Sequence, residues 1–530
     1  MLKRETCTQS VHPNGRLTVP RLHNAAGLVL LALNAACLHA QGGPPGPPPA
    51  RAEQLPLSGR TGSPGGVDTV QNPVPGGAQT VNTLSSNVQV QGAYQGSVPA
   101  AQAAGAILPL TLADAIRRGL EYNLGTVGYQ NAARQARAQE LLARSALLPN
   151  VSGYALLTEE QVNLATFGFH FNLPIPGFTF PTIVGPFHYI DLRAQLTQTV
   201  VDLTTLRNYR ASRQNAKATD LSAQDARDLV VLAVTGGYLS IISAAARIDS
   251  ARAQVASAQA LYQQAFDRHN AGVAARIDVT RSQVELQTQQ QRLTSEETDF
   301  AKQKIQLGRL IGLPPGQDFT LSDTLPYAPI TGLTLDQALQ RAAMNRADLK
   351  AAQAQMEAAE LTKKAAAAER YPTVQLAGDY GVNGTSPQNS HGTFSVTGSV
   401  RFPIWEGGRI RGDIEQADAA LSQRRSEYED LRGRVDADIR QAFLDLTAAA
   451  NQVTVAQSNR ELAQETLTQA RDRFAAGVAD TVEVVQAQEQ VAGAEQDYIS
   501  SLYAHNLAKA SLARSMGQAE QGIQQLLGRP

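Results

Sequence analysis

Apolar residues along most of this chain recur with the spacing of amphipathic helices, and two of the helical stretches are very long. They run without a proline from about Leu203 to His269 and from about Gly408 to Phe474. At roughly 1.5 Å per residue, each predicts a helix of about 100 Å. Shorter helices should return along them, from about Arg276 to Leu310 and from about Thr481 to Met516. Helices this long need lateral neighbours, so we expect coiled-coil-like hairpins.

In front of each long helix the periodicity changes to two, the spacing of β-strands. The segments are Val151 to about Thr158, Ile190–Leu196, Val374–Val382 and Phe394–Phe402. Strands of about ten residues with one apolar and one polar face are typical of transmembrane β-barrels, although half-buried soluble hairpins share the pattern. The periodicity alone leaves both structures open. The long helices, which cannot fold into one compact core, favour the membrane structure.

The elements are arranged as an internal duplication. Leu110-Thr111-Leu112 and Leu333-Thr334-Leu335 open corresponding helices, and Ala-Gly-Val-Ala occurs around both Gly272 and Gly477. We therefore expect two structural repeats, at residues 108–317 and 333–517. A linker at residues 318–332 would join them, and a tail would occupy residues 518–530.

The first hundred residues differ from this body. Basic residues precede the apolar run Ala25–Ala36, and Leu38-His39-Ala40 offers a cleavage site, which predicts a signal peptide over residues 1–40. Cys37 is an alternative lipid attachment site, although Asn34 stands where a lipoprotein signal usually has leucine. Residues 41–107 are rich in Pro, Gly, Ser and Gln and predict a flexible linker.

One stretch is apolar enough to suggest a membrane-spanning helix. Leu229–Ala246 carries no charge and is close to the length of a membrane span. Gly236, Gly237 and two serines dilute it, and the corresponding stretch of the second repeat, around Arg440–Asp445, is charged. We therefore interpret it as the buried face of a helix.

The repeated glycine phrase predicts the turn between each long helix and its returning partner. Gly272 and Gly477 would permit the non-helical backbone of the turn. Asp278 and Glu483 follow in the first turns of the returning helices, where an acid complements the helix dipole. These residues could serve only to end and restart helices. Alternatively, the two tips form a mouth or a docking surface.

The order of these motifs, in duplicate, resembles the outer-membrane efflux protein family, the TolC-like channel-tunnels. The resemblance covers about Leu110 to Met516 and includes the strand-to-helix junctions Thr199–Asp202 and Pro403–Gly408. It implies a mainly α-helical mixed fold, with long periplasmic helical hairpins forming an α-barrel and four transmembrane strands per protomer. It also implies a homotrimer with a shared 12-strand β-barrel. Four strands cannot close a barrel in lipid, which excludes a monomer independently but leaves a dimer open. The long loop at about Glu159 to Phe187 would face outside.

The resemblance also assigns roles to the two tips. Residues that would contact a periplasmic adaptor protein are Gly272, Val273, Ala274, Gly477, Val478 and Ala479. A periplasmic gate would involve Asp278, Glu483, Gln486 and Phe474. Glu483 matches one of two acidic rings at the tunnel entrance, whereas Gln486 is uncharged at the second. Phe474 lacks the hydroxyl, and Ala479 the charge, that would pair with an acid such as Asp278. The closing network is therefore incomplete, and another arrangement must hold the mouth.

The remaining composition argues against other functions. The net charge of −1 gives no reason to expect nucleic acid. The scattered histidines have no metal-ligand spacing, and no phosphate-binding loop is present, so neither an enzyme nor a cofactor is expected. We expect a passive duct of a tripartite efflux or type I secretion system in the outer membrane of a Gram-negative-type cell, extending into the periplasm. Its partners would be outer-membrane lipid, a periplasmic adaptor and an inner-membrane pump. An exported coiled-coil scaffold or adhesin is the alternative, and the adaptor itself is a third.

Overall fold

The structure is a computed structural model of the 530-residue chain. It describes residues 51–53, 55–56, 65–74, 83–99, 106–167, 182–323, 327–330 and 332–526. The predicted leader over residues 1–40, Cys37 and residues 168–181 of the predicted outer loop lie outside the described residues. The described residues all belong to one compact unit, which spans residues 50–530.

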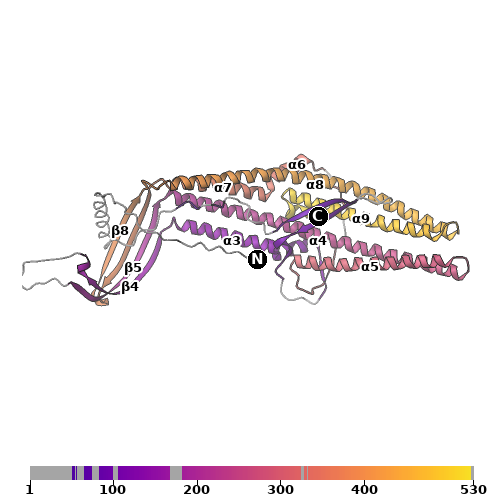
Figure 1. The fold of residues 1–530 in the computed structure, drawn as a ribbon, viewed down its shortest axis with the longest axis horizontal. Coiled ribbons are helices and arrows are strands. Elements are labelled where there is room, and N and C mark those ends of the chain that lie inside the picture. The colour runs from indigo at the N-terminus through magenta and orange to yellow at the C-terminus, as the bar shows by residue number, and fades with distance from the viewer. Residues whose placement is uncertain are drawn as a thin grey trace, which may run out of the picture. The chain divides into compact units, whose positions relative to one another are not determined.

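Two long helical hairpins dominate the fold (Figure 1). The first pairs α4 (Leu203–Asn270) with α5 (Arg276–Leu310), and the second pairs α8 (Arg409–Ala475) with α9 (Thr481–Ser515). The predicted helix ends agree with these bounds within one or two residues. Asp202 caps α4, because its Oδ1 accepts hydrogen bonds from the backbone N–H groups of Thr204 at 2.8 Å and Thr205 at 3.1 Å.

Shorter helices lie beside the long ones in the same order in each half of the chain. They are α2 (Leu112–Tyr122) and α3 (Leu124–Ser145) in the first half and α6 (Leu335–Asn345) and α7 (Ala347–Ala368) in the second. Thr111 and Thr334 cap α2 and α6 in the same way, each accepting from the backbone N–H three residues on. Corresponding sequence phrases therefore have corresponding local structures.

A four-stranded antiparallel sheet precedes the long helices. Its strands β4 (Asn150–Asn163), β5 (Ile183–Val201), β7 (Thr373–Gly384) and β8 (Ser390–Arg401) pair in the order β4-β5-β7-β8. Each strand covers a segment that the alternation predicted, and β4 and β5 extend further into the expected loop. The register places Tyr380 opposite Phe394 and Asp379 opposite Ser395. Apolar and polar rows therefore alternate across the sheet, and Phe394 is 77% exposed on the apolar face.

The helices extend from one end of the strands and form a wall, in which they are arranged in the same order as the strands in the sheet (Figure 1). α3 packs on α4, α4 on α7, and α7 on α8. In the sheet, β4 and β8 are the outer strands, and in the wall α3 and α8 are the outer helices. The protomer thus has two open edges along its length. One edge is formed by β4 of the sheet and α3 of the wall, and the other is formed by β8 and α8.

The largest apolar core surrounds the middle of α4. Val230, Val234, Tyr238 and Ile241 are fully buried there against α2, α5 and α9. This helix contains the one apolar window in the described residues that is long enough to cross a membrane, and 72% of that window is buried. The interpretation of Leu229–Ala246 as a buried helix face is confirmed.

The expectation of a flexible linker over residues 41–107 is wrong for part of that range. Strands β1 (Val67–Val74) and β2 (Thr83–Val90) form an antiparallel pair that packs on α4 and α9. β3 (Leu108–Leu110) pairs with β6 (Phe319–Leu321), which lies in the predicted inter-repeat linker. In the predicted tail, α10 (Ala519–Leu526) packs on α4 and α9. These segments are ordered by distant helices, which local composition does not reveal.

Candidate functional site

The turns of the two hairpins have the same backbone geometry. Gly272 and Gly477 have φ angles of 76° and 74°, a conformation that L side chains rarely adopt. In both turns the glycine N–H and the next N–H donate back to the end of the helix, at 2.9 and 3.0 Å in the first turn and 3.1 and 3.0 Å in the second. A Cβ at either glycine would meet open space, so the backbone conformation alone explains the residue.

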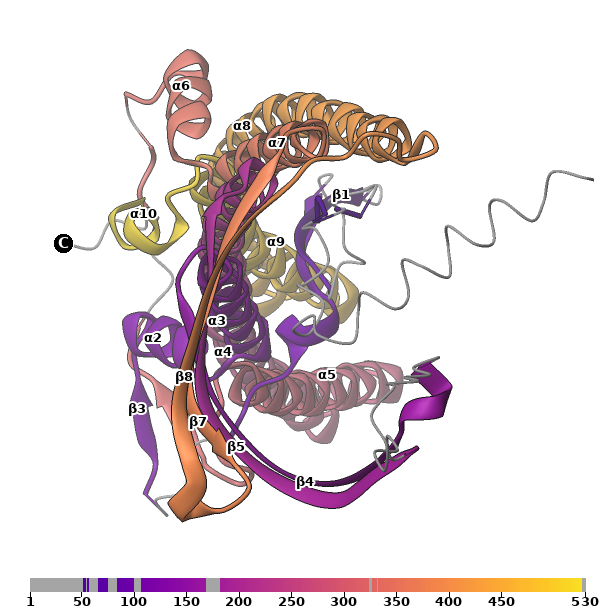
Figure 2. The ribbon, with the colours of Figure 1, turned by 90° about the vertical axis from the view of Figure 1, so that its left-hand side faces the viewer.

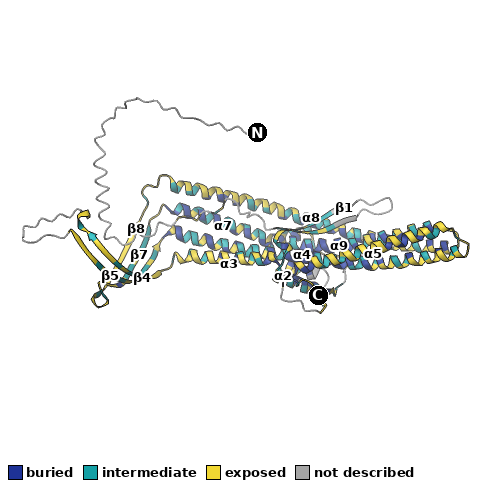
Figure 3. Cartoon of the chain, turned by 60° about the horizontal axis from the view of Figure 1, so that its bottom comes forward, coloured by how far each residue is buried: buried dark blue, intermediate teal, exposed yellow. Residues whose placement is uncertain are grey.

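The tips of the two hairpins are largely exposed (Figure 3). Val273 is 75% exposed and Val478 is 71% exposed, whereas Ala274 and Ala479 are half-buried. Asp480 caps α9 by accepting from the Glu483 N–H at 3.1 Å, while Ala275 caps α5 without a side-chain bond. The two tips are alike in shape and differ in how the returning helix begins. Exposed valines on turns of this kind offer a small apolar contact surface.

The gate residues predicted from the resemblance have different surroundings within the protomer. Glu483 pairs with Arg473 of its own hairpin, with Arg473 Nε 3.2 Å from Glu483 Oε1. Asp278 is half-buried and forms no ion pair with another described residue, and Gln486 is exposed. The negative field expected from Glu483 is therefore partly neutralised by Arg473. Because both side chains are well exposed, the pair contributes little stability.

Phe474 occupies a different environment, in the contact between the two hairpins. Its side chain is 6% exposed and packs with Leu261 of α4 and Val484 of α9. The Arg268 guanidinium, from the end of α4, lies 4.2 Å from the centroid of the Phe474 ring. Arg268 Nη2 also donates to the carbonyl oxygens of Phe474 at 3.0 Å and Ala475 at 3.3 Å. A cation thus lies over an aromatic face and at the negative C-terminal end of α8.

We call this contact of Arg268 with Phe474 and Ala475 the tip clamp. It joins the first hairpin to the second within one protomer, and Arg268 was not among the residues predicted from the sequence. A signal was present: Asp267-Arg268 and Asp472-Arg473 each stand just before their turn. The two arginines nevertheless make different contacts, because Arg268 crosses to the other hairpin and Arg473 stays within its own.

A second polar contact joins the hairpins further from the tips. Ser257 Oγ on α4 accepts from Gln488 Nε2 on α9 at 2.7 Å and also contacts Arg471 of α8. This contact borders a cavity of about 620 Å³ between the hairpins, whose lining also includes Glu285, Arg460, Leu467 and Tyr498. The hairpins are thus tied at the tips and at Ser257, and they separate around a cavity with both polar and apolar walls.

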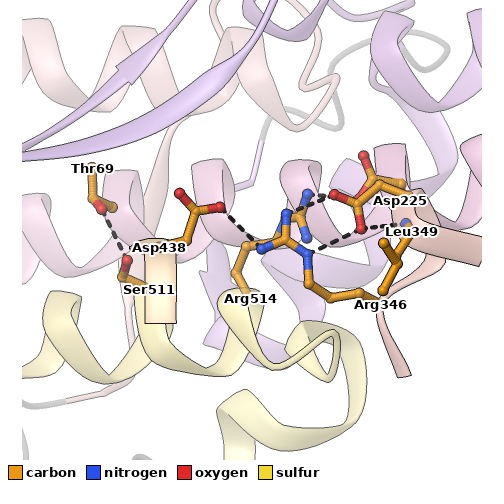
Figure 4. Close-up of polar contacts among 8 residues, drawn as sticks. Thr69, Asp225, Arg346, Leu349, Asp438, Ser511 and Arg514 are labelled. Carbon is orange, nitrogen blue, oxygen red and sulfur yellow. Dashed lines mark hydrogen bonds and ion pairs between the residues drawn. The ribbon is translucent and has the colours of Figure 1, made fainter. Parts of the chain in front are cut away.

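Buried charges tie the helices together in the middle of the fold (Figure 4). Arg346, before α7, bonds Asp348 Oδ2 at 2.6 Å and Asp438 Oδ2 of α8 at 3.0 Å. Arg514 of α9 bonds Asp225 Oδ1 of α4 at 2.6 Å. Burial raises the pKa of Asp225, and burial raises the pKa of the neighbouring Asp228 to about 6. Losing one partner would leave a buried charge unpaired, so this network should fix how α4, α7, α8 and α9 pack.

The described residues contain no group of three or more His, Cys, Asp or Glu side chains that could hold a metal ion.

Within the sheet, Arg193 of β5 bonds Asp379 Oδ1 of β7 at 2.9 Å and Asp191 of its own strand, on the polar face. Polar side chains there are therefore paired with one another, and the apolar face is exposed.

Comparison with known proteins gives a consistent result. The family model described as "Outer membrane efflux protein" matches residues 129–313 and 338–518. The chain is 26% identical over 320 residues to the "Toluene efflux pump outer membrane protein TtgF" of Pseudomonas putida, covering 58% of this chain and 65% of that protein. It is 20% identical to "Outer membrane protein TolC" of Escherichia coli over 341 residues, covering 61% of this chain and 68% of TolC. The match thus spans slightly less than two thirds of the toluene efflux protein.

Solved structures share the fold. The outer membrane protein VceC of Vibrio cholerae superposes with a TM-score of 0.64 at 18% identity, covering 77% of this chain and 96% of VceC. The CmeC outer membrane channel of Campylobacter jejuni superposes with a TM-score of 0.66 at 15% identity, covering 79% of this chain and 89% of CmeC. At these identities the likeness shows the fold alone.

Proposed function

This chain belongs to the outer membrane efflux protein family, and from that premise we propose that three copies form a passive duct across the outer membrane and periplasm. The main support for the proposal is that the sheet and the helical wall of the protomer each have two open edges. The β4 edge of one copy can pair with the β8 edge of the next, and α3 can pack beside the next copy's α8. In the sheet order β4-β5-β7-β8, each strand is antiparallel to its neighbour, so β8 and the next copy's β4 would also pair antiparallel.

If the sheet lies in lipid, as we propose, its open edges must be closed by pairing with other copies. Phe394, Val396 and Val400 are 77%, 70% and 63% exposed on the apolar face, which suits contact with lipid. In lipid, the unpaired backbone groups of β4 and β8 would each lack a hydrogen-bond partner. Three copies supply twelve strands and a twelve-helix wall, the assembly that the family resemblance implies.

The turn phrases lie at the other end of the hairpins and fit contact with partner proteins. Val273 and Val478, with their glycines, would meet a periplasmic adaptor that connects the duct to an inner-membrane pump. The mouth would be held by the tip clamp in place of the acid-centred network, which by the family resemblance is incomplete in this chain. Residues 1–40 would serve in export, with Cys37 as the lipid attachment site if the leader is cut before it.

The two functions that the sequence left open predict different behaviour. A duct requires detergent for solubility and conducts ions when reconstituted in planar lipid bilayers. An exported scaffold or adhesin would remain soluble without detergent and leave the bilayer insulating. Stepwise ion conductance by the purified protein therefore supports the duct, and an insulating bilayer with protein shown to be inserted would overturn it.

A further inference from the structure

The strand pair β1–β2 packs against the helices with one face and exposes the other to solvent. The register pairs Val67 with Val90, Thr69 with Val88 and Asp68 with Gln89. Val67 is buried and Val88 and Val90 pack against the core, whereas Asp68, Asn87 and Gln89 are exposed. Among the described residues, Val70, which pairs with Asn87, is the one apolar residue beside them on that side. We call the side with Asp68, Asn87 and Gln89 the polar face of the hairpin.

The hairpin is fitted closely to the helices beneath it. A Cβ at Gly236 of α4 would lie 2.2 Å from Cγ2 of Val88, so glycine is needed there for the strand to approach. Thr69 Oγ1 is 2.9 Å from Ser511 Oγ of α9. The glycine that dilutes the apolar stretch of α4 is therefore explained by the contact with β2. In the second repeat, Gln441 and Asp445 of the corresponding stretch border a cavity that Val67, Asp68 and Thr69 of β1 also line.

The hairpin covers a different face of α4 from the one covered by α2 and β3. Val234 lies against Gly119 of α2, and Tyr238 Oη donates to the Leu110 carbonyl of β3 at 2.9 Å. Ala233, Gly236 and Ser240 line the space under β2, roughly 130° around the helix from Val234 and its neighbours. This double cover explains why this part of α4 is apolar nearly all round.

The view along the helices shows which side of the wall the hairpin occupies (Figure 2). β1 lies on the concave side of the curved sheet, whereas α2, β3, α6 and α10 lie on the convex side. When curved walls close into a tube, their concave sides face the axis. The polar face of the hairpin would then point into the tube.

We propose that the β1–β2 hairpin lines the duct and narrows it, so that it limits the size of the cargo that passes. The proposal rests on the duct function above. Twelve helices about 10 Å apart enclose a bore of about 30 Å between helix surfaces. A strand layer adds about 10 Å to the wall of each copy, which leaves an opening of about 10 Å. Asp68, Asn87 and Gln89 would form the wall of this opening, suited to polar or hydrated cargo.

Cysteine labelling of the reconstituted channel tests the proposal. The variant Gln89→Cys places a thiol on the polar face, and Asp68→Cys repeats the test from the strand opposite. Glu121→Cys, exposed on α2, is the matched control on the convex side. All three are made in a background in which the two native cysteines, Cys7 and Cys37, are serine. Each channel is treated with a bulky polyethylene-glycol maleimide, and labelling is verified by mass.

Modification of Gln89→Cys or Asp68→Cys should reduce single-channel conductance by more than half, and modification of Glu121→Cys should leave it unchanged. Fully labelled Gln89→Cys and Asp68→Cys channels with unchanged conductance would overturn the proposal while the duct function stands. Thiols at both positions that react only after unfolding would also overturn it, because the hairpin would then lie against a neighbouring copy. If the wild-type protein does not conduct, the duct function itself fails.

Discussion

Removing the tip clamp should open the mouth of the channel without unfolding the protein. The substitution Arg268→Met replaces the aliphatic part of the side chain but removes the guanidinium that lies 4.2 Å from the Phe474 ring and bonds the Phe474 and Ala475 carbonyls. Phe474 would stay packed against Leu261 and Val484. The change therefore acts on the connection between the hairpins and leaves the large core around α4 intact.

The expected loss follows from the contacts. A partly exposed cation–π contact contributes about 0.5–1 kcal/mol, and hydrogen bonds from a charged donor contribute about 1.5–3 kcal/mol when they are buried. Arg268 is only half-buried, so we expect a total of about 1–3 kcal/mol per protomer. Because about 1.4 kcal/mol is a tenfold change in an equilibrium constant, three such losses would substantially shift the balance between closed and open mouths.

Single-channel recording in planar bilayers measures this shift, and Arg473→Met is the matched control. Arg473 holds the corresponding position in the second hairpin but contacts Glu483 of its own hairpin. Recordings at about 1 M salt, where the Debye length is about 3 Å, remove most of the effect of the altered charge. We expect a higher conductance for Arg268→Met and wild-type conductance for Arg473→Met. Equal conductance of both variants and the wild type would refute the clamp.

Three further predictions concern other parts of the chain. Val396→Arg, on the apolar face of β8, should cost roughly 2–4 kcal/mol in the membrane and reduce the yield of assembled protein, whereas Thr397→Arg on the polar face should assemble normally; equal yields would contradict the assignment of the two faces. Gln486→Asp should strengthen block by multivalent cations in bilayer recordings, because it adds a second acid near the mouth; unchanged block would place this residue away from the ion path. Burial raises the pKa of Asp228 to about 6 from 3.8, so the folded state binds more protons between these values and stability falls as pH rises from about 4 to 6. Asp228→Asn should reduce this fall by about 1–3 kcal/mol in thermal unfolding at several pH values, and an identical pH profile would contradict the raised pKa.

The sequence was most informative where structure depends on local periodicity. The ends of α4 and α8 could be predicted because an uninterrupted helical pattern stops at a phrase whose glycines adopt positive φ. The strands could be predicted because their two faces differ in polarity along the chain. Once the strands pair, this alternation along each strand places apolar residues opposite apolar residues and polar residues opposite polar residues across much of the sheet.

Features made by distant residues were not predicted. The strand β2 contains the alternation Asn87-Val88-Gln89-Val90, but it is short and surrounded by Pro- and Gly-rich sequence. Its apolar side is buried by α4 and α9, which lie far along the chain. Arg268 likewise gains its role from Phe474 of the other hairpin. Contacts of this kind depend on how the hairpins pack, and the pattern near each residue carries little information about that packing.

The mass of the detergent-solubilised particle tests the proposed duct most directly, because a closed duct requires each open edge of a protomer to meet the opposite edge of another copy. Native mass spectrometry, in a detergent that can be stripped from the protein, should give three chains per particle and no stable monomer. A homogeneous monomer that stays folded without detergent would contradict the account, since it would leave β4 and β8 unpaired and show that the sheet does not form part of a closed barrel.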